Sequence, residues 1–245
     1  MYISILNYCL LCCFVQSKYY PLVKIFINEK TVEIVGLEAS VDKSKYDVCI
    51  ASEEEIISKV LIGNVLIVEA NAKHIQRLLK LLEIKKLKKL LSITLSAKNA
   101  EFLQEYFKDE FKIIKASGGV VMKEDKILMI YRLGKWDLPK GKLKKGEDSI
   151  KGAKREVEEE CSVNILVKDK ICSTWHTYIR KDRKILKKTD WYNMDCISDA
   201  NMRPQIEENI EEVRWMTKEE VMIALNNSYK SIERVFEKFY EVRVV

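Results

Sequence analysis

The segment from residue 141 to residue 163 restricts the fold more than any other part of this 245-residue chain. It starts with a glycine in a lysine-rich loop and ends in the acidic stretch Arg155-Glu156-Val157-Glu158-Glu159-Glu160. In a helix, the residues at 156, 159 and 160 stand on one face within about one turn. Three carboxylates so close repel one another unless a cation lies among them, and Mg²⁺ and Mn²⁺ bind oxygen ligands of this kind. The pattern therefore predicts a helix whose acidic face holds a divalent cation.

Residues on both sides of the acidic face extend this candidate site. Arg155 can hold a carboxylate of Glu159 or Glu147 in place, and the turn at Gly141 brings loop carbonyls towards the same face. Four lysines of the loop add positive charge that suits a polyphosphate: Lys140, Lys142, Lys144 and Lys145.

The same segment resembles the signature of the Nudix hydrolase family, GX5EX7REUXEEXGU, in which U is an aliphatic residue. The matching positions are Gly141, Glu147, Arg155, Glu156, Val157, Glu159, Glu160 and Val163. The single departure is Ser162, which stands where the signature has a glycine. Because that glycine ends the helix in a left-handed turn, we expect serine there to cost about 1 kcal/mol or less. Local stability, more than chemistry, is affected.

The resemblance covers about residues 111–226. It includes Gly118-Gly119-Val120-Val121, Arg132, the run from Trp136 to Lys142, and Arg214-Trp215-Met216. It implies an α/β (α+β) chain with a Nudix fold, in which a mixed β-sheet is sandwiched between helices, over residues 111–245. Short strands and helices alternate over residues 23–110, which we expect to form a small α/β domain. This part looks like the accessory domain that precedes some bacterial Nudix domains.

Hydrophobic periodicity and turn residues predict the individual elements. In the first part we expect strands at 23–27, 31–35, 65–68 and 91–95, a helix capped by Asn71 and a helix at 97–107. In the second part we expect strands at 118–122, 127–130, 171–179, 184–196 and 212–216, a loop at 136–141, and helices at 148–161, 217–226 and 231–240. Thr217 and Glu220 are spaced as a capping box.

Residues 1–22 allow three interpretations. The apolar run from Ile3 to Val15 is about half as long as a bilayer span requires. Translation could begin near Leu22 or Val23, although no methionine lies between Met1 and Met122 and such a start needs an alternative codon. The second interpretation is an extra buried strand or helix, and the third is a membrane-targeting segment.

The resemblance implies metal-dependent hydrolysis of a pyrophosphate linkage in a nucleoside diphosphate linked to another group. It implies Mg²⁺ or Mn²⁺ bound by Glu156, Glu159, Glu160 and the backbone carbonyl of Lys140. Water activated by the metal attacks phosphorus in this chemistry. We expect Glu156, Glu159 and Arg155 to take part in catalysis and Gly141 and Glu147 to shape the site. Substrate binding is expected from Arg132, Trp136, Lys140 and Lys142.

Several roles stay open at this point. The base that takes the proton of the attacking water is Glu156 or a glutamate of a late loop, Glu207, Glu208 or Glu211, which are otherwise surface acids. His176 either contacts substrate or is a strand histidine bonded to a neighbour. Trp136 can stack on a base or line the pocket, whereas Trp191 and Tyr192 are expected to pack the sheet.

Composition limits the partners and the compartment. The net charge of +6 favours an anionic partner, and we expect a small phosphorylated substrate, in particular a nucleotide, without DNA or membrane binding. A homodimer is left open. The seven cysteines are odd in number and lack facing CxxC pairs, which indicates reduced thiols in a cytoplasmic protein. The alternative function is a nucleotide-sensing regulator, but such regulators often lose carboxylates that this chain retains.

Overall fold

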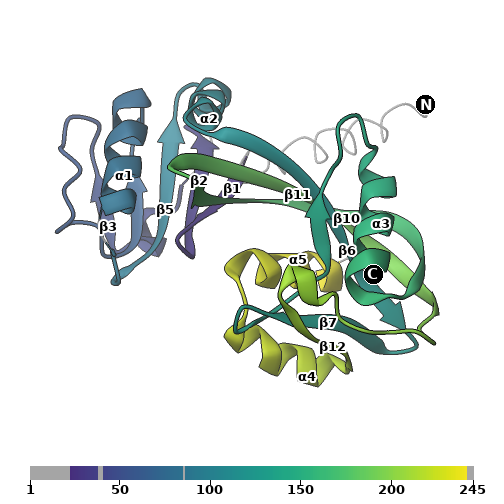
Figure 1. The fold of residues 1–245 in the computed structure, drawn as a ribbon. Helices are drawn as coiled ribbons and strands as arrows, with labels where there is room; N and C mark the ends of the chain where they lie inside the picture. The colour runs from purple at the N-terminus through teal and green to yellow at the C-terminus, as the bar shows by residue number, and fades with distance from the viewer. Residues whose placement is uncertain (1–22, 38–40, 85, 242–245) are drawn as a thin grey trace, which may run out of the picture. The chain divides into compact units, whose positions relative to one another are not determined.

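The computed structural model describes residues 23–37, 41–84 and 86–241 (Figure 1). The predicted extension at residues 1–22 lies outside these ranges, and so do Cys9, Cys12 and Cys13. The described residues form two compact units. One comprises residues 23–24 and 32–107, and the other comprises residues 25–31 and 108–241. Residues 25–31 thus belong to the second unit, whereas the sequence analysis assigned them to the first domain. The predicted domain boundary after residue 110 stays a prediction.

The first unit is a small α/β arrangement, with strands in the order β2-β5-β4-β3. Its elements are β2 (Lys30–Gly36), β3 (Val48–Ile50), β4 (Gly63–Ile67), α1 (Ala72–Ile84), β5 (Leu90–Ala97) and α2 (Ala100–Asp109). Asn71 caps α1 as predicted, because its Oδ1 accepts hydrogen bonds from the backbone N–H of Lys73 at 3.0 Å and of His74 at 3.4 Å. The apolar side chains at helical spacing on α1, Ile75, Leu78, Leu79 and Leu82, are buried.

The second unit is built on a mixed sheet with strands in the order β12-β7-β6-β11-β10-β1. The strands are β1 (Val23–Ile27), β6 (Lys112–Lys123), β7 (Lys126–Arg132), β10 (Asn164–Arg180), β11 (Arg183–Ser198) and β12 (Ile210–Met216). β11 runs parallel to β6 and antiparallel to β10, while β1 runs parallel to β10. The long β10 and β11 begin and end beyond the ranges that the sequence predicted.

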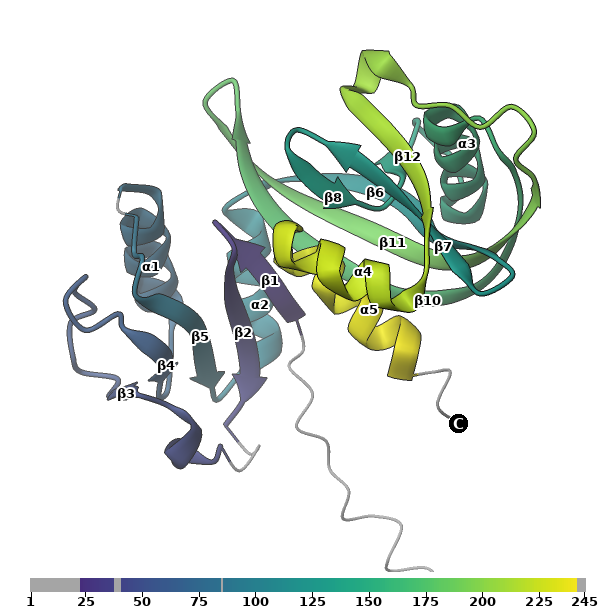
Figure 2. The same ribbon diagram turned by 90° about the horizontal axis from the view of Figure 1, so that it is seen from below.

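Helices cover both faces of this sheet, α3 (Ser149–Cys161) on one side and α4 (Lys218–Ala224) and α5 (Lys230–Glu241) on the other (Figure 2). Successive residues of β6 point to opposite faces. Val120 accordingly packs in the core beneath α4 and α5, whereas Val121 packs in the core beneath α3. The predicted class, a mixed sheet between helices, is confirmed.

The predicted loop at 136–141 is partly wrong, because it contains two short strands. β8 (Lys135–Asp137) pairs with β7, and β9 (Lys140–Lys142) pairs with β6. β6 pairs with β7 only at residues 122–123, so residues 116–118 of β6 are available to pair with β9. Gly118 permits this approach, since a Cβ at that position would lie 2.2 Å from the carbonyl oxygen of Pro139. This pairing depends on contacts with strands elsewhere in the chain, and a six-residue segment is too short to show it as a hydrophobic periodicity.

The helix that carries the acidic face begins and ends as the sequence predicts. The carboxylate of Asp148 accepts hydrogen bonds from the backbone N–H groups of Ile150 and Lys151 at 2.9 and 3.2 Å. Ser162 follows the last turn with φ 52° and ψ 43°, the left-handed conformation that the signature's glycine adopts freely. The capping box of α4, formed by Thr217 and Glu220, is also present.

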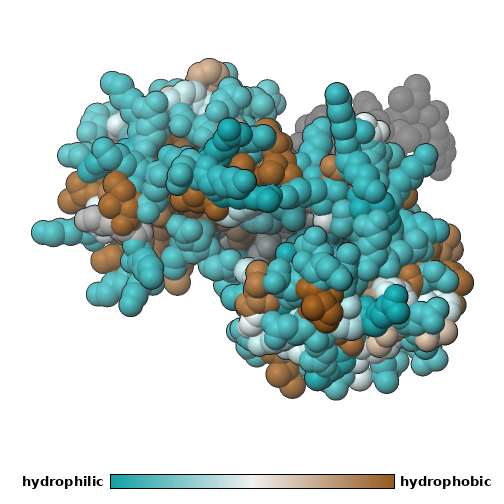
Figure 3. Space-filling model, in the orientation of Figure 1, coloured by the Kyte–Doolittle hydropathy of each residue, from teal (hydrophilic) through white to brown (hydrophobic). Residues whose placement is uncertain are grey.

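Most of the face shown in Figure 3 is hydrophilic. No helix in the described ranges is long and apolar enough to cross a membrane. The four cysteines of these ranges, Cys49, Cys161, Cys172 and Cys196, form no disulfide with one another.

Replacing Ser162 with glycine should raise stability. Glycine adopts positive φ without a steric penalty, so we expect Ser162→Gly to raise the free energy of unfolding by up to about 1 kcal/mol. Urea denaturation measures this, with Ser162→Ala, which keeps the Cβ atom, as the matched control. A glycine variant no more stable than the alanine variant would contradict the strain assigned to this position.

Candidate functional site

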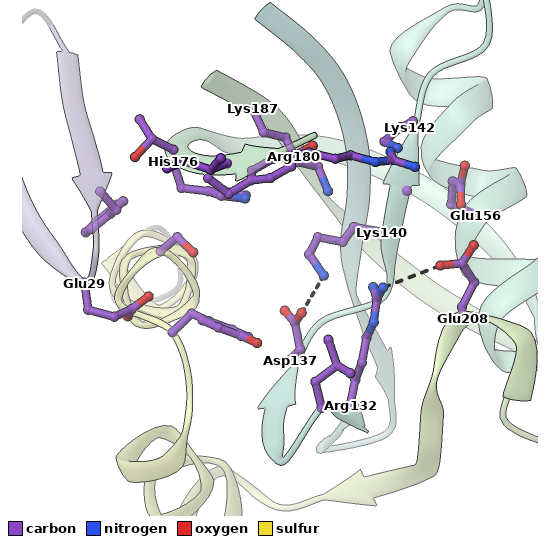
Figure 4. A pocket seen from close by; sticks show the side chains of 18 of the residues that line it. Glu29, Arg132, Asp137, Lys140, Lys142, Glu156, His176, Arg180, Lys187 and Glu208 are labelled. Carbon is purple, nitrogen blue, oxygen red and sulfur yellow. Dashed lines mark hydrogen bonds and ion pairs between the residues drawn. The ribbon is translucent and has the colours of Figure 1, made fainter. Parts of the chain in front are cut away.

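A pocket of about 890 Å³ lies within the second unit (Figure 4). Glu156 and Glu160 of α3 line it together with Lys140 to Lys142 of β9. Side chains of β10 and β11 form another part of its lining, and residues before β2 and at the start of α5 complete it. Residues from widely separated parts of the sequence therefore meet at one place.

Arg155 organises the carboxylates around α3. Its guanidinium group donates two parallel hydrogen bonds to Glu147, from Nε and Nη2, both at 2.8 Å. Nη1 donates to Glu156 at 2.8 Å and to Glu159 at 2.9 Å, and Nη2 also donates to the carbonyl of Lys142 at 3.2 Å. Hydrogen bonding to Arg155 and to the backbone of Lys144 lowers the pKa of Glu147 to about 2. The same pairing raises the pKa of Arg155, so Glu147 and Arg155 are both charged at neutral pH.

Gly141 lies directly against the carboxylate of Glu156. A Cβ at residue 141 would stand 1.8 Å from Glu156 Oε2, so any larger residue displaces that carboxylate. The structure thus places Gly141 where it fixes the approach of the loop to α3. Arg155 bonds Oε1 of the same carboxylate, which leaves Oε2 on the side of the loop.

Glu160 is the deepest acid of the site, with 1% of the residue exposed. Its Oε2 accepts a hydrogen bond from the backbone N–H of Lys140 at 2.9 Å. Burial raises the pKa of Glu160 to about 7, although the charge of Lys140 works in the opposite direction. The ammonium group of Lys140 is itself paired with Asp137 at 2.5 Å. The predicted substrate-binding side chain of Lys140 is therefore engaged within the protein.

Arg132 and Glu208 meet at the rim of the pocket, 3.5 Å apart (Figure 4). Arg132 comes from the end of β7, and Glu208 from the 3₁₀ turn Ile206–Glu208. Of the three late glutamates proposed as bases, Glu208 lines the pocket, and Glu207 and Glu211 are not part of its lining. Nε of Arg132 is buried and has no hydrogen-bond partner among the described residues.

Four predicted site residues lie outside the pocket lining: Glu147, Arg155, Glu159 and Trp136. The side chain of Glu159 is 48% exposed and is held by Arg155. The ring of Trp136 contacts Tyr131, with centroids 5.0 Å apart, and the guanidinium group of Arg214 lies 5.3 Å from its centroid. Trp136 is partly buried against the core beneath α4 and α5, and its stacking on a base stays a prediction. The expected packing role of Trp191 is confirmed, since it is buried and bonds Thr174 at 2.8 Å.

Several lining residues were not foreseen from the sequence. Glu29 lies in the turn after β1, and its carboxylate accepts a hydrogen bond from the backbone N–H of Lys230 at the start of α5. Lys187 of β11 stands opposite His176 of β10, and both line the pocket. Burial lowers the pKa of His176 to about 4 and that of Lys187 to about 8. Grouping Lys187 with His176 requires the register of the β10–β11 hairpin, which the sequence pattern does not supply.

The donor atoms suit a hard divalent cation. Glu156 and Glu160 line the same pocket as the backbone of Lys140 and Gly141, so carboxylate and carbonyl oxygens lie together. The hydrogen bonds described above use one oxygen of each carboxylate. Within the described ranges, no three side chains of His, Cys, Asp or Glu are close enough to form a complete metal site on their own. The residues fit a cation that is held by the two carboxylates of Glu156 and Glu160, with backbone carbonyl oxygens and water molecules completing its coordination shell. That Glu159 is a third carboxylate ligand stays a prediction.

Comparison with protein families decides the classification. Residues 113–239, more than half of the chain, match the NUDIX domain. The chain belongs to the NUDIX family. It is a hydrolase of this family, as the resemblance of the 141–163 segment predicted. A search among curated proteins finds no match.

Solved structures that resemble this chain have low sequence identity to it. A NUDIX hydrolase from Nitrosomonas europaea is 20% identical and covers 53% of this chain and 90% of its own, with a TM-score of 0.45. The MutT protein of Methanosarcina mazei Go1 is 19% identical and covers 55% and 97%, with a TM-score of 0.44. The C. elegans Ap4A hydrolase in a binary complex is 20% identical and covers 54% and 98%, with a TM-score of 0.41. These scores select no substrate.

Glu147 should make stability depend on pH in acid. Its folded pKa of about 2 lies below its ordinary value, so its contribution to stability is present above pH 4.5 and is lost as the pH falls towards 2. We expect Glu147→Gln to melt below the wild type at pH 6, and the difference in melting temperature to shrink as the pH falls. Thermal melts monitored by circular dichroism measure it. A difference independent of pH would show that the Arg155 pair does not hold this carboxylate ionised.

Proposed function

We propose that this protein cleaves a pyrophosphate linkage in a nucleoside diphosphate linked to another group, with Mg²⁺ or Mn²⁺ as cofactor. One observation carries the proposal: carboxylates of α3 and cations of β9, β10 and β11 line the same pocket. Lys142, Arg180 and Lys187 form no ion pair with any described residue. A substrate rich in phosphate charge complements these cations, and it requires a metal to approach Glu156 and Glu160.

The chain's own residues have separable tasks in this reaction. Lys142, Arg180 and Lys187 bind and orient the phosphate groups. Glu156 and Glu160, with the carbonyl of Lys140, hold the divalent cation, which supplies positive charge against the oxygens of the phosphoryl group under attack. Arg155 fixes the position of Glu156 through the hydrogen bond at Oε1. The positioning of Glu156 by Arg155 is a contact within the protein, whereas the binding of phosphate and of the cation requires bound ligands.

The proton of the attacking water needs an acceptor in the pocket. Glu156 and Glu208 both line it, Glu156 from α3 and Glu208 from the 3₁₀ turn before β12. Glu208 is held by a single long ion pair to Arg132, so its carboxylate can still reach a water molecule. We propose Glu208 as the acceptor, with Glu156 as the alternative if Glu208 proves dispensable.

The first unit and the compartment belong to the same proposal. None of the residues that line the pocket comes from residues 32–107. We propose that this part is an accessory domain and that the enzyme acts in the cytoplasm with its cysteines reduced. The complete set of signature carboxylates favours an enzyme over a nucleotide-sensing regulator, because a sensor needs no activated water.

Loss of one carboxylate should reduce turnover much more than stability. We expect Glu160→Gln and Glu156→Gln each to lower kcat by at least about a hundredfold, since each removes a charged ligand of the transition-state cation. Glu158→Gln on the same helix is the matched control and should change kcat by less than about threefold. Turnover is measured with Mg²⁺ on ATP, ADP-ribose and a dinucleoside polyphosphate. Full activity of either site variant at saturating Mg²⁺ would rule out the metal assignment.

A second series of variants tests the proton acceptor. Glu208→Gln should lower kcat by about a hundredfold or more and remove the acidic limb of the pH–rate profile. Glu207→Gln and Glu211→Gln should remain near wild type, because neither side chain lines the pocket. If Glu208→Gln retains both its rate and its pH profile, the acceptor is not Glu208.

A further inference from the structure

A second hollow, of about 420 Å³, lies at the tip of the β10–β11 hairpin. It is lined by four basic residues and two isoleucines: Lys112, Ile114, Arg180, Lys181, Arg183 and Ile185. No acidic residue is part of this lining. Arg180 lines both this hollow and the pocket described above, so the two sites adjoin.

Strand register shows that the two sites share one face of the sheet. On β11, residues 183, 185 and 187 point to the same face because alternate residues do so. Their partners on β10 are Arg180, Tyr178 and His176, and Ile185 stands opposite Lys112 on β6. The Cα atoms of Lys187 and Arg183 are about 13 Å apart along the strand. A row of linked phosphates fits this spacing better than a single pyrophosphate does.

The basic residues of the hollow are not neutralised within the protein. Lys112, Arg180, Lys181 and Arg183 form no ion pair with any described residue, and Asp182 in the turn does not pair with them. Arg180 and Arg183 stand directly opposite each other in the register, where like charges destabilise a strand pair. Such an arrangement is costly unless an anion neutralises it.

The opposite face of the same strands provides a comparison. There Lys188 of β11 and Lys170 of β10 both lie near the carboxylate of Asp190, at 3.7 and 2.7 Å. Lys188 also lies over the ring of Trp175, 5.7 Å from its centroid. Basic residues on that face have partners, so the unpaired set on the pocket face is not a general property of the hairpin.

We propose that this hollow is a second phosphate-binding subsite, which takes the outer phosphates of a linear polyphosphate chain whose reacting linkage lies in the pocket. The assignment rests on the proposed function for the location of that linkage. Basic side chains suit phosphate groups, whereas the bases of a nucleic acid would need aromatic rings to stack on, and none of the six lining residues is aromatic. Substrates with long phosphate chains would therefore bind better than those with two phosphates.

Binding without metal tests the subsite separately from turnover. The full chain is titrated calorimetrically with a long-chain linear inorganic polyphosphate and with pyrophosphate, for the wild type and for Lys112→Gln/Arg183→Gln. We expect the double variant to bind the long chain at least about tenfold more weakly, because two charge-assisted contacts are lost. Its affinity for pyrophosphate should stay within about twofold, since pyrophosphate occupies the pocket alone.

The matched control is Lys115→Gln/Lys126→Gln, which removes the same charge from exposed positions outside both sites. Lys115 lies on β6 three residues after Lys112 and points to the opposite face. Equal weakening by the two double variants would show a general charge effect and overturn the subsite, as would no weakening by either. A single-stranded RNA whose binding alone depends on Lys112 and Arg183 would overturn it in favour of a nucleic acid. Turnover is measured in a separate assay with Mg²⁺, and its absence in the wild type would contradict the proposed function and leave the metal-free binding result standing.

Discussion

The ion pairs of Arg155 are the interaction on which the site depends. One guanidinium group joins Glu147, Glu156 and Glu159 and also bonds a loop carbonyl, so the loop before α3 and the helix itself are held as one body. A planar group with five donors can do this, whereas a lysine could not make the parallel pair to Glu147. Because Arg155 satisfies part of the negative charge, the helix tolerates its acidic face before any cation binds. Gly141 then lets the loop lie against Glu156 without displacing it.

A second constraint is the change of partner along β6. This strand bonds β9 over residues 116–118 and β7 only at residues 122–123, so the sheet divides where the pocket lies. The division places Lys140 beside Glu160 and brings Arg132 at the end of β7 to the rim. The long pair β10 and β11 provides the opposite lining and continues past the pocket to the basic hollow. The same geometry thus underlies both the proposed reaction and the proposed preference for extended phosphate chains.

The sequence predicted the parts of the site whose information is local. Residues 141–163 hold the glycine, the arginine and the glutamates within one loop and one helix, and helical spacing alone groups residues 156, 159 and 160. Caps at Asn71 and Thr217 were readable for the same reason. The contributions of Glu29, His176 and Lys187 depend on strand register and on contacts between distant segments, which periodicity cannot supply. The short strands β8 and β9 form only because β7 and β6 offer them partners, and Trp136 of β8 is partly buried against the core beneath α4 and α5.

The central claim is that this pocket hydrolyses a phosphoanhydride and does more than bind one. It is tested most directly by following a nucleoside polyphosphate with the full chain and Mg²⁺ in ¹⁸O-labelled water, with phosphorus NMR to detect the products. The account predicts many turnovers per protein molecule and one ¹⁸O atom incorporated for each linkage cleaved, because water is the nucleophile. Tight binding of nucleotide in the presence of metal without labelled product, across nucleoside triphosphates, nucleotide sugars and dinucleoside polyphosphates, would contradict it and favour a nucleotide sensor.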